Sequence, residues 1–138
     1  MNKTNAQKIR DFHLAVGGSA PTQPERPSAE TLDLRQTLIR EEYEEVCEAI
    51  EQLRSGATDD ITHLMHECAD LLYVVYGTLD ACGVDADAVF GEVHRANMMK
   101  ASGPRRADGK ILKPDNFKPA DVGSIIAAQP PDALATHS

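Results

Sequence analysis

The sequence contains no tryptophan and few aromatic residues of any kind. Aromatic residues make up 4% of the 138 positions, whereas hydrophobic residues as a whole make up 41%. The apolar side chains are therefore mostly aliphatic, which favours a helical core of Leu, Ile, Val and Ala. Strand-like alternation of useful length is also missing, so we predict an all-α protein.

Cysteines and long apolar segments are equally sparse. Cys47, Cys68 and Cys82 are odd in number and lack CxxC spacing, so we expect reduced core residues rather than a disulfide framework. The longest apolar run, "LLYVVYGTL", is too short to span a bilayer, and the N-terminus lacks the apolar stretch of a signal peptide. We therefore expect a cytoplasmic protein with no membrane partner.

The sequence has fewer positive than negative residues: 14 Lys and Arg compared with 22 Asp and Glu, which gives a net charge of −8. This balance opposes nonspecific binding to nucleic acid. The GxxxxGK[ST] loop of P-loop enzymes does not occur either. If the substrate is a polyanion, metal cations must offset its charge.

The length suits one domain with a single core. Caps and glycine stops predict helices at about residues 4–16, 28–54, 60–82, 85–100 and 120–129, a four-to-five-helix bundle. Between the last two lies a turn-rich basic segment, "RRADGKILKPDNFKPADV". We assign residues 1–128 to one all-α domain and expect residues 129–138 to form a disordered tail.

The second predicted helix carries an acidic run in "LIREEYEEVCEAI". Its core face recurs at three- and four-residue steps through Leu32, Ile39, Val46, Ile50 and Leu53. Glu42 lies on this face, Glu45 falls beside it one turn along, and Glu41 borders the same surface. Glu44 and Glu48 lie on the opposite, solvated side. The run therefore divides into inner and outer acids.

The third predicted helix repeats this anomaly, because Glu67 and Asp70 stand three residues apart in an otherwise apolar segment. Unpaired ionised carboxylates in such a place would cost several kcal/mol each. Acids from two helices aimed at one region therefore predict a cation, and hard oxygen ligands favour Mg²⁺ or Mn²⁺. We expect His63 and His66 to face solvent or the rim.

The pattern Glu41-Glu42-x-x-Glu45, then 21 residues, then Glu67-x-x-Asp70, resembles the EExxE…ExxD signature of the MazG-like all-α nucleoside triphosphate pyrophosphohydrolases. The downstream "VHRANMMKASGPRRADGKILKPDNFKPADV" is similar to the segment that follows in MazG-like members. The resemblance covers residues 30–122, with the first helix and the tail outside it.

This resemblance implies a homodimer or dimer of dimers that hydrolyses a nucleoside triphosphate to a monophosphate and pyrophosphate. It implies Mg²⁺, or Mn²⁺ in its place, held by Glu41, Glu42, Glu45, Glu67 and Asp70. Glu41 and Glu42 are the implied catalytic acids. Asn97 and Lys100 would bind sugar or phosphate, and Lys110 and Lys113 would hold the β and γ phosphates.

The substrate base stays open, with dUTP, dCTP or noncanonical nucleotides as candidates. Some relatives stack the base on Trp, and Phe117 occupies the place where we expect one. A phosphoribosyl-ATP pyrophosphohydrolase would keep the same acids and reaction. Two alternatives from other classes are a non-catalytic helical dimer and a di-iron bundle, although only Asp60-x-x-His63 approaches the Glu-x-x-His pattern that di-iron sites use.

Overall fold

The computed structural model describes residues 2–18 and 20–135, and the all-α prediction is confirmed. The five helices are α1 (Asn5–Ala15), α2 (Ala29–Arg54), α3 (Thr62–Ala81), α4 (Ala86–Ala101) and α5 (Val122–Ala127). Extended pairing in this described part is limited to one isolated bridge between Arg105 and Ile111. None of the described helices is both long and apolar enough to cross a bilayer.

Side-chain caps explain where the helices begin. Thr4 and Gln7 form a capping box at α1, while Ser28 and Asp85 accept backbone N–H bonds at the starts of α2 and α4. At α3 the capping position by backbone geometry is Ile61, yet Asp60 accepts a bond from the Thr62 N–H at 2.8 Å. These local signals are the ones visible in the sequence.

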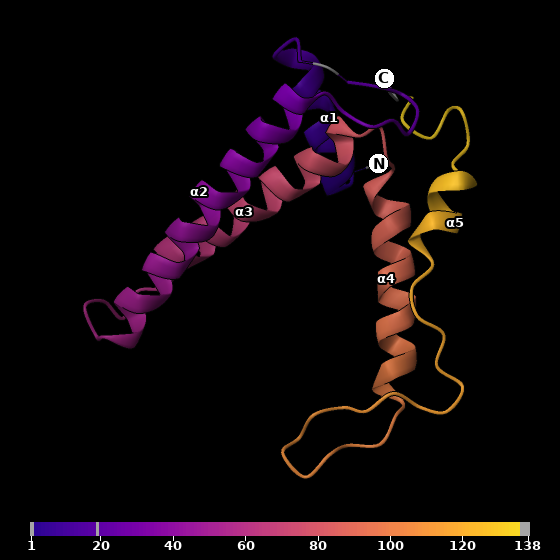
Figure 1. The fold of residues 1–138 in the computed structure, drawn as a ribbon. Coiled ribbons are helices and arrows are strands. Elements are labelled where there is room, and N and C mark those ends of the chain that lie inside the picture. The colour runs from indigo at the N-terminus through magenta and orange to yellow at the C-terminus, as the bar shows by residue number, and fades with distance from the viewer. Residues whose placement is uncertain (1, 19, 136–138) are drawn as a thin grey trace.

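The helices form two groups (Figure 1). Helices α2 and α3 run antiparallel as a long pair, and α1 lies against the C-terminal part of α3. Helix α4 leaves the end of α3 and diverges from that pair, with α5 packed on its side. A single chain therefore does not close its helices into one bundle.

A buried ionic network fastens α1 to α3. Asp80 accepts a bond from the Arg10 guanidinium at 3.3 Å and pairs with Nδ1 of His13 at 2.7 Å. Close by, Gly77 leaves room for the guanidinium of Arg35, whose Nη2 would lie 2.4 Å from any Cβ at that position. Arg35 donates to the Val74 carbonyl at 2.8 Å and so joins α2 to α3.

The turn between α3 and α4 holds the end of the chain. Gly83 has a φ of 69°, and a Cβ there would lie 2.1 Å from the Gln23 carbonyl oxygen. Gln129 donates to the Gly83 carbonyl and accepts from the Asp85 N–H, both at 2.9 Å. Gln129, the first residue of the tail predicted to be disordered, therefore has defined contacts, whereas residues 136–138 lie outside the described part.

The buried apolar core is small, consisting of Ile9, Val46, Ala49, Ala81, Val84, Ala86 and Ala96. We predicted a largely buried third helix, but Leu72 is 57% exposed and Met65 50% exposed. Cys47 is exposed as well, contrary to a core position. The chain has 9504 Å² of accessible surface, against about 7,000 Å² for a compact monomer of this mass. One chain alone therefore leaves much apolar surface uncovered.

Candidate functional site

Three carboxylates from the α2–α3 pair meet at one place. Glu42 comes from α2, and Glu67 and Asp70 come from α3, with one oxygen of each within 4.8 Å of the others. The meeting follows from helical spacing, because residues three apart share a face and that face of α3 is turned to α2. We call these residues the acidic cluster. Glu42 and Glu67 are partly buried, as predicted for inner positions, whereas the Asp70 side chain is 42% exposed.

Two oxygens of the acidic cluster lack partners. Oε2 of Glu42 and Oε2 of Glu67 are buried and make no hydrogen bond. The Glu67 side chain is only 12% exposed, so solvent gives it little compensation. An unsatisfied buried acceptor costs roughly 1–3 kcal/mol, more when it is charged. Oxygen ligands are those that Mg²⁺ prefers, so the residues present fit a divalent cation.

The electrostatics agree with that assignment. Desolvation raises the pKa of Glu42, and the neighbouring carboxyls of Glu45, Asp70 and Glu67 raise it further. For Glu67, a hydrogen bond with Glu45 is the main cause of a raised pKa, followed by desolvation. Without a cation Glu42 and Glu67 therefore hold their protons more tightly than free carboxyls do, because ionising one carboxyl opposes ionising the next.

The other predicted acids lie around the cluster. Glu45 is exposed, and its carboxyl raises the pKa of both Glu42 and Glu67. Glu41 is exposed and lies outside the three-carboxylate group, so its metal and catalytic roles stay predictions. Glu44 and Glu48 are exposed, in keeping with the outer side assigned to them.

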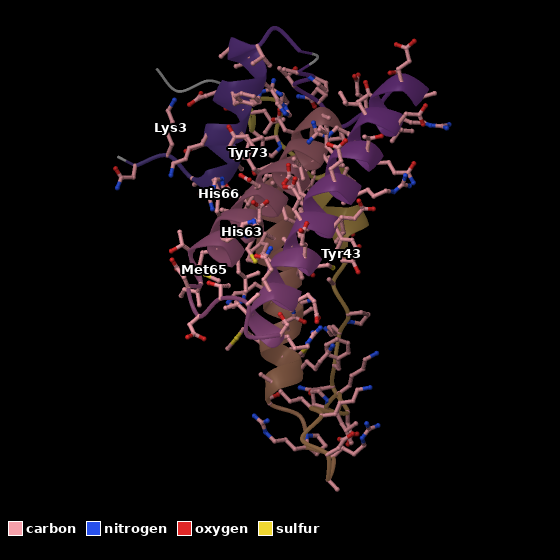
Figure 2. All side chains as sticks on the ribbon, turned by 90° about the vertical axis from the view of Figure 1, so that its left-hand side faces the viewer. Lys3, Tyr43, His63, Met65, His66 and Tyr73 are labelled. Atoms are coloured by element: carbon pink, nitrogen blue, oxygen red, sulfur yellow. The ribbon has the colours of Figure 1, made fainter. Side chains whose placement is uncertain are left out.

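Two histidines of α3, labelled in Figure 2, each lie near a carboxylate of the cluster. Nε2 of His63 lies 3.2 Å from Oε1 of Glu67, and Nε2 of His66 lies 3.2 Å from Oδ2 of Asp70. The His63 side chain is 49% exposed and the His66 side chain 70% exposed, so the rim position was correctly predicted. Their contact with the acids was missed, although the four-residue spacing of each pair signals it.

The predicted phosphate-binding residues stand elsewhere. Two of them, Asn97 and Lys100, are on α4, which diverges from the α2–α3 pair (Figure 1). The other two, Lys110 and Lys113, are on the loop that follows α4. Within one chain they do not meet the acidic cluster. Phe117, the candidate base-stacking residue, has the Lys113 ammonium 5.3 Å from its ring centroid.

An all-helical chain in which an EExxE helix faces an ExxD helix defines the class of MazG-like all-α nucleotide pyrophosphohydrolases. A family model of phosphoribosyl-ATP pyrophosphohydrolase matches residues 9–97. The chain therefore belongs to this family, within that class. The match includes most of α1, which lies outside the motif resemblance over residues 30–122, and it ends at Asn97.

A viral relative extends the comparison without adding a function. The chain is 30% identical over 88 residues to a protein of Acanthamoeba polyphaga mimivirus that is described as uncharacterized. The match covers 61% of this chain and 33% of the viral protein, so this chain corresponds to about a third of that relative.

Proposed function

We propose that the protein is a divalent-metal-dependent pyrophosphohydrolase that converts a nucleoside triphosphate to a nucleoside monophosphate and pyrophosphate. The observation that supports this most is the acidic cluster of Glu42, Glu67 and Asp70, with its two buried and unpartnered oxygens. The phosphoribosyl-ATP pyrophosphohydrolase family provides the reaction class.

The acids have separate tasks in this proposal. Glu42, Glu67 and Asp70 hold the cation, and Glu45 completes the ligand set from its exposed position beside them. When bound there, Mg²⁺ or Mn²⁺ polarises the α-phosphate and lowers the pKa of the attacking water. Glu41 or Glu42 accepts the proton of that water; both residues are on α2, and Glu42 belongs to the cluster.

A second copy of the chain supplies the residues that one copy keeps away from the cluster. Residues 95–118 contain seven Lys or Arg and two Asp, in a chain whose net charge is −8. This basic segment complements the acidic α2–α3 pair of a partner. Asn97, Lys100, Lys110 and Lys113 then reach the substrate phosphates from across the interface. The exposed apolar residues of α3 are covered at the same time, in a homodimer or dimer of dimers.

Phosphoribosyl-ATP is a second candidate substrate, favoured by the description of the matching family. It presents the same triphosphate chain, so the acidic cluster serves both substrates equally. The nucleoside triphosphates kept as candidates are dUTP, dCTP and noncanonical nucleotides, consistent with maintenance of the nucleotide pool.

The test is a substrate panel assayed with Mg²⁺ for pyrophosphate release, followed by hydrolysis of the best substrate in ¹⁸O-labelled water. Attack at the α-phosphorus places the label in the monophosphate and leaves pyrophosphate unlabelled. Release of a nucleoside diphosphate and orthophosphate as primary products contradicts the proposed reaction. Inactivity on the whole panel, phosphoribosyl-ATP included, favours the non-catalytic or di-iron alternatives.

A further inference from the structure

The loop between α4 and α5 is folded against the end of α4. We call residues 102–121 the lysine loop, because they include two of the predicted phosphate-binding lysines. The Leu112 N–H donates to the Pro104 carbonyl at 2.7 Å, so the first part of the loop turns back on itself. A Cβ at Gly103 would overlap the Leu112 carbonyl oxygen, and glycine therefore lets the returning chain pass close to the helix end.

The second part of the loop brings a cation and an aromatic ring together. The Phe117 N–H donates to the Pro114 carbonyl at 3.0 Å, which closes a turn. Across this turn the Lys113 ammonium lies 5.3 Å from the centroid of the Phe117 ring. These contacts fix the shape of the turn, whereas its position depends on how the loop is attached to α4.

An arginine of α4 holds the returning end of the loop. Nη2 of Arg95 donates to the carbonyl oxygens of Lys118 and Pro119, at 3.2 and 3.3 Å. The same guanidinium donates to both carboxylate oxygens of Glu92, at 2.8 Å from Nη2 and 3.0 Å from Nε. Glu92 in turn accepts from the Asp121 N–H at 3.1 Å. The ion pair thus binds backbone groups of three loop residues.

Arginine is the residue type that suits this geometry. Its planar guanidinium presents five N–H donors in a fixed fork and can hold a carboxylate and two carbonyls at once, whereas a lysine ammonium is a point charge on a flexible stem. Another contact at this end of the loop is weaker, because the Lys118 N–H donates to Sδ of Met99 at 3.3 Å and a thioether is a poor acceptor. Arg95 is therefore the main polar anchor of this end.

We propose that Arg95 is a positioning residue that holds the lysine loop on α4, so that Lys113 and Phe117 meet the substrate from a fixed place. Asn97 and Lys100 belong to the same helix, so the anchor makes one unit of the groups predicted to bind the substrate. The inference rests on the proposed function, because it assumes that this loop contacts substrate phosphates. A loop ordered in advance loses less freedom when the substrate binds, which strengthens binding.

The experiment compares Arg95→Gln and Arg95→Lys with the wild type, using the purified full chain. Hydrogen exchange followed by NMR should be at least about tenfold faster at the Lys118 and Asp121 amides in both variants, because the anchor is lost. The KM for the best substrate should rise about tenfold, while kcat changes much less, because the loop contributes to binding in the ground state and the transition state alike. The Mn²⁺ affinity of the acidic cluster should stay the same.

The matched control is Arg54→Gln. Arg54 forms an ion pair of the same spacing with Glu51 on α2, so its loss should leave loop exchange and KM unchanged. Unchanged exchange in Arg95→Gln overturns the anchoring, and faster exchange with an unchanged KM overturns its link to the substrate. A KM that rises in Arg95→Gln and returns to the wild-type value in Arg95→Lys, with exchange still fast, shows that the charge of Arg95 contacts phosphate directly and overturns the positioning role.

Calorimetric binding of pyrophosphate in the presence of Mg²⁺ separates this inference from the proposed function. Wild-type protein that turns over no substrate contradicts the proposed function. The inference then stands if pyrophosphate still binds and its affinity falls about tenfold in Arg95→Gln. It is overturned if the wild type binds no pyrophosphate or if both proteins bind it equally well.

Discussion

Replacing Glu42 with Gln should stabilise the metal-free protein while removing its activity. The substitution keeps the size and shape of the side chain but deletes one of three charges whose oxygens lie within 4.8 Å of one another. The pKa of Glu42 is already raised, chiefly by desolvation and then by Glu45, so its ionised form is the unfavourable one in the fold. Removing the charge relieves that penalty.

The expected gain follows from the distance. Two unit charges 4.8 Å apart repel by about 1 kcal/mol in a water-like medium, which is the lower limit for a partly buried group such as Glu42. The free energy of unfolding of metal-free Glu42→Gln should therefore rise by about 1 kcal/mol, which corresponds to about 3 °C in Tm. In Mg²⁺ at 100 times its Kd the wild type should become more stable than Glu42→Gln, because metal binding adds about 2.7 kcal/mol to its free energy of unfolding.

The pH dependence gives this prediction a second check. A carboxyl whose pKa is raised by folding binds its proton more tightly in the folded state, so stability falls as pH rises above the ordinary value of 4.5. Below that value both states are protonated. The advantage of Glu42→Gln should therefore be present at neutral pH and vanish near pH 4.5 and below.

The assays are thermal unfolding in EDTA and in Mg²⁺ across this pH range, with turnover of the best substrate, which should fall by at least about 100-fold. The matched control is Glu44→Gln on the exposed side of the same helix, which should change little. The reasoning fails if Glu42→Gln is less stable than the wild type in EDTA. It fails equally if Glu44→Gln is as damaging to turnover as Glu42→Gln.

Two further predictions concern assembly and the α4–α5 contact. Light scattering of the wild type should give a mass at least twice the 15.0 kDa of one chain. Replacing the exposed Leu72 of α3 with Glu should lower that mass. A wild-type monomer at micromolar concentration contradicts a site shared between two copies. Arg95 and the Asp121 N–H lower the pKa of Glu92 to about 2, so its stabilisation should be present above about pH 4.5 and lost as pH falls toward 2. Glu92→Gln should remove that part of the dependence in urea unfolding; a parallel pH profile for both proteins contradicts it.

The sequence by itself determined the helices and the inner position of Glu42. Glu41 and Glu45, which were predicted to share or border that face, are exposed like the outer acids. Ser28 and Asp85 mark helix starts through bonds that reach only two or three residues along the chain, so local pattern suffices to find them. The inner position of Glu42 follows from its steps to Ile39 and Val46, and that of Glu67 and Asp70 from their mutual spacing. Periodicity fixes the face on which a side chain lies.

Only the tertiary structure decided which faces meet. Gln52 orients His63, which lies 11 residues away, because α2 and α3 are paired side by side, and no spacing rule links those positions. The divergence of α4 carries Asn97 and Lys100 away from the acids, since packing partners rather than helical propensity set the direction of a helix. For the same reason, the exposure of Leu72 could not be predicted from an apolar pattern: that pattern shows that a face requires a partner, but not whether the same chain provides it.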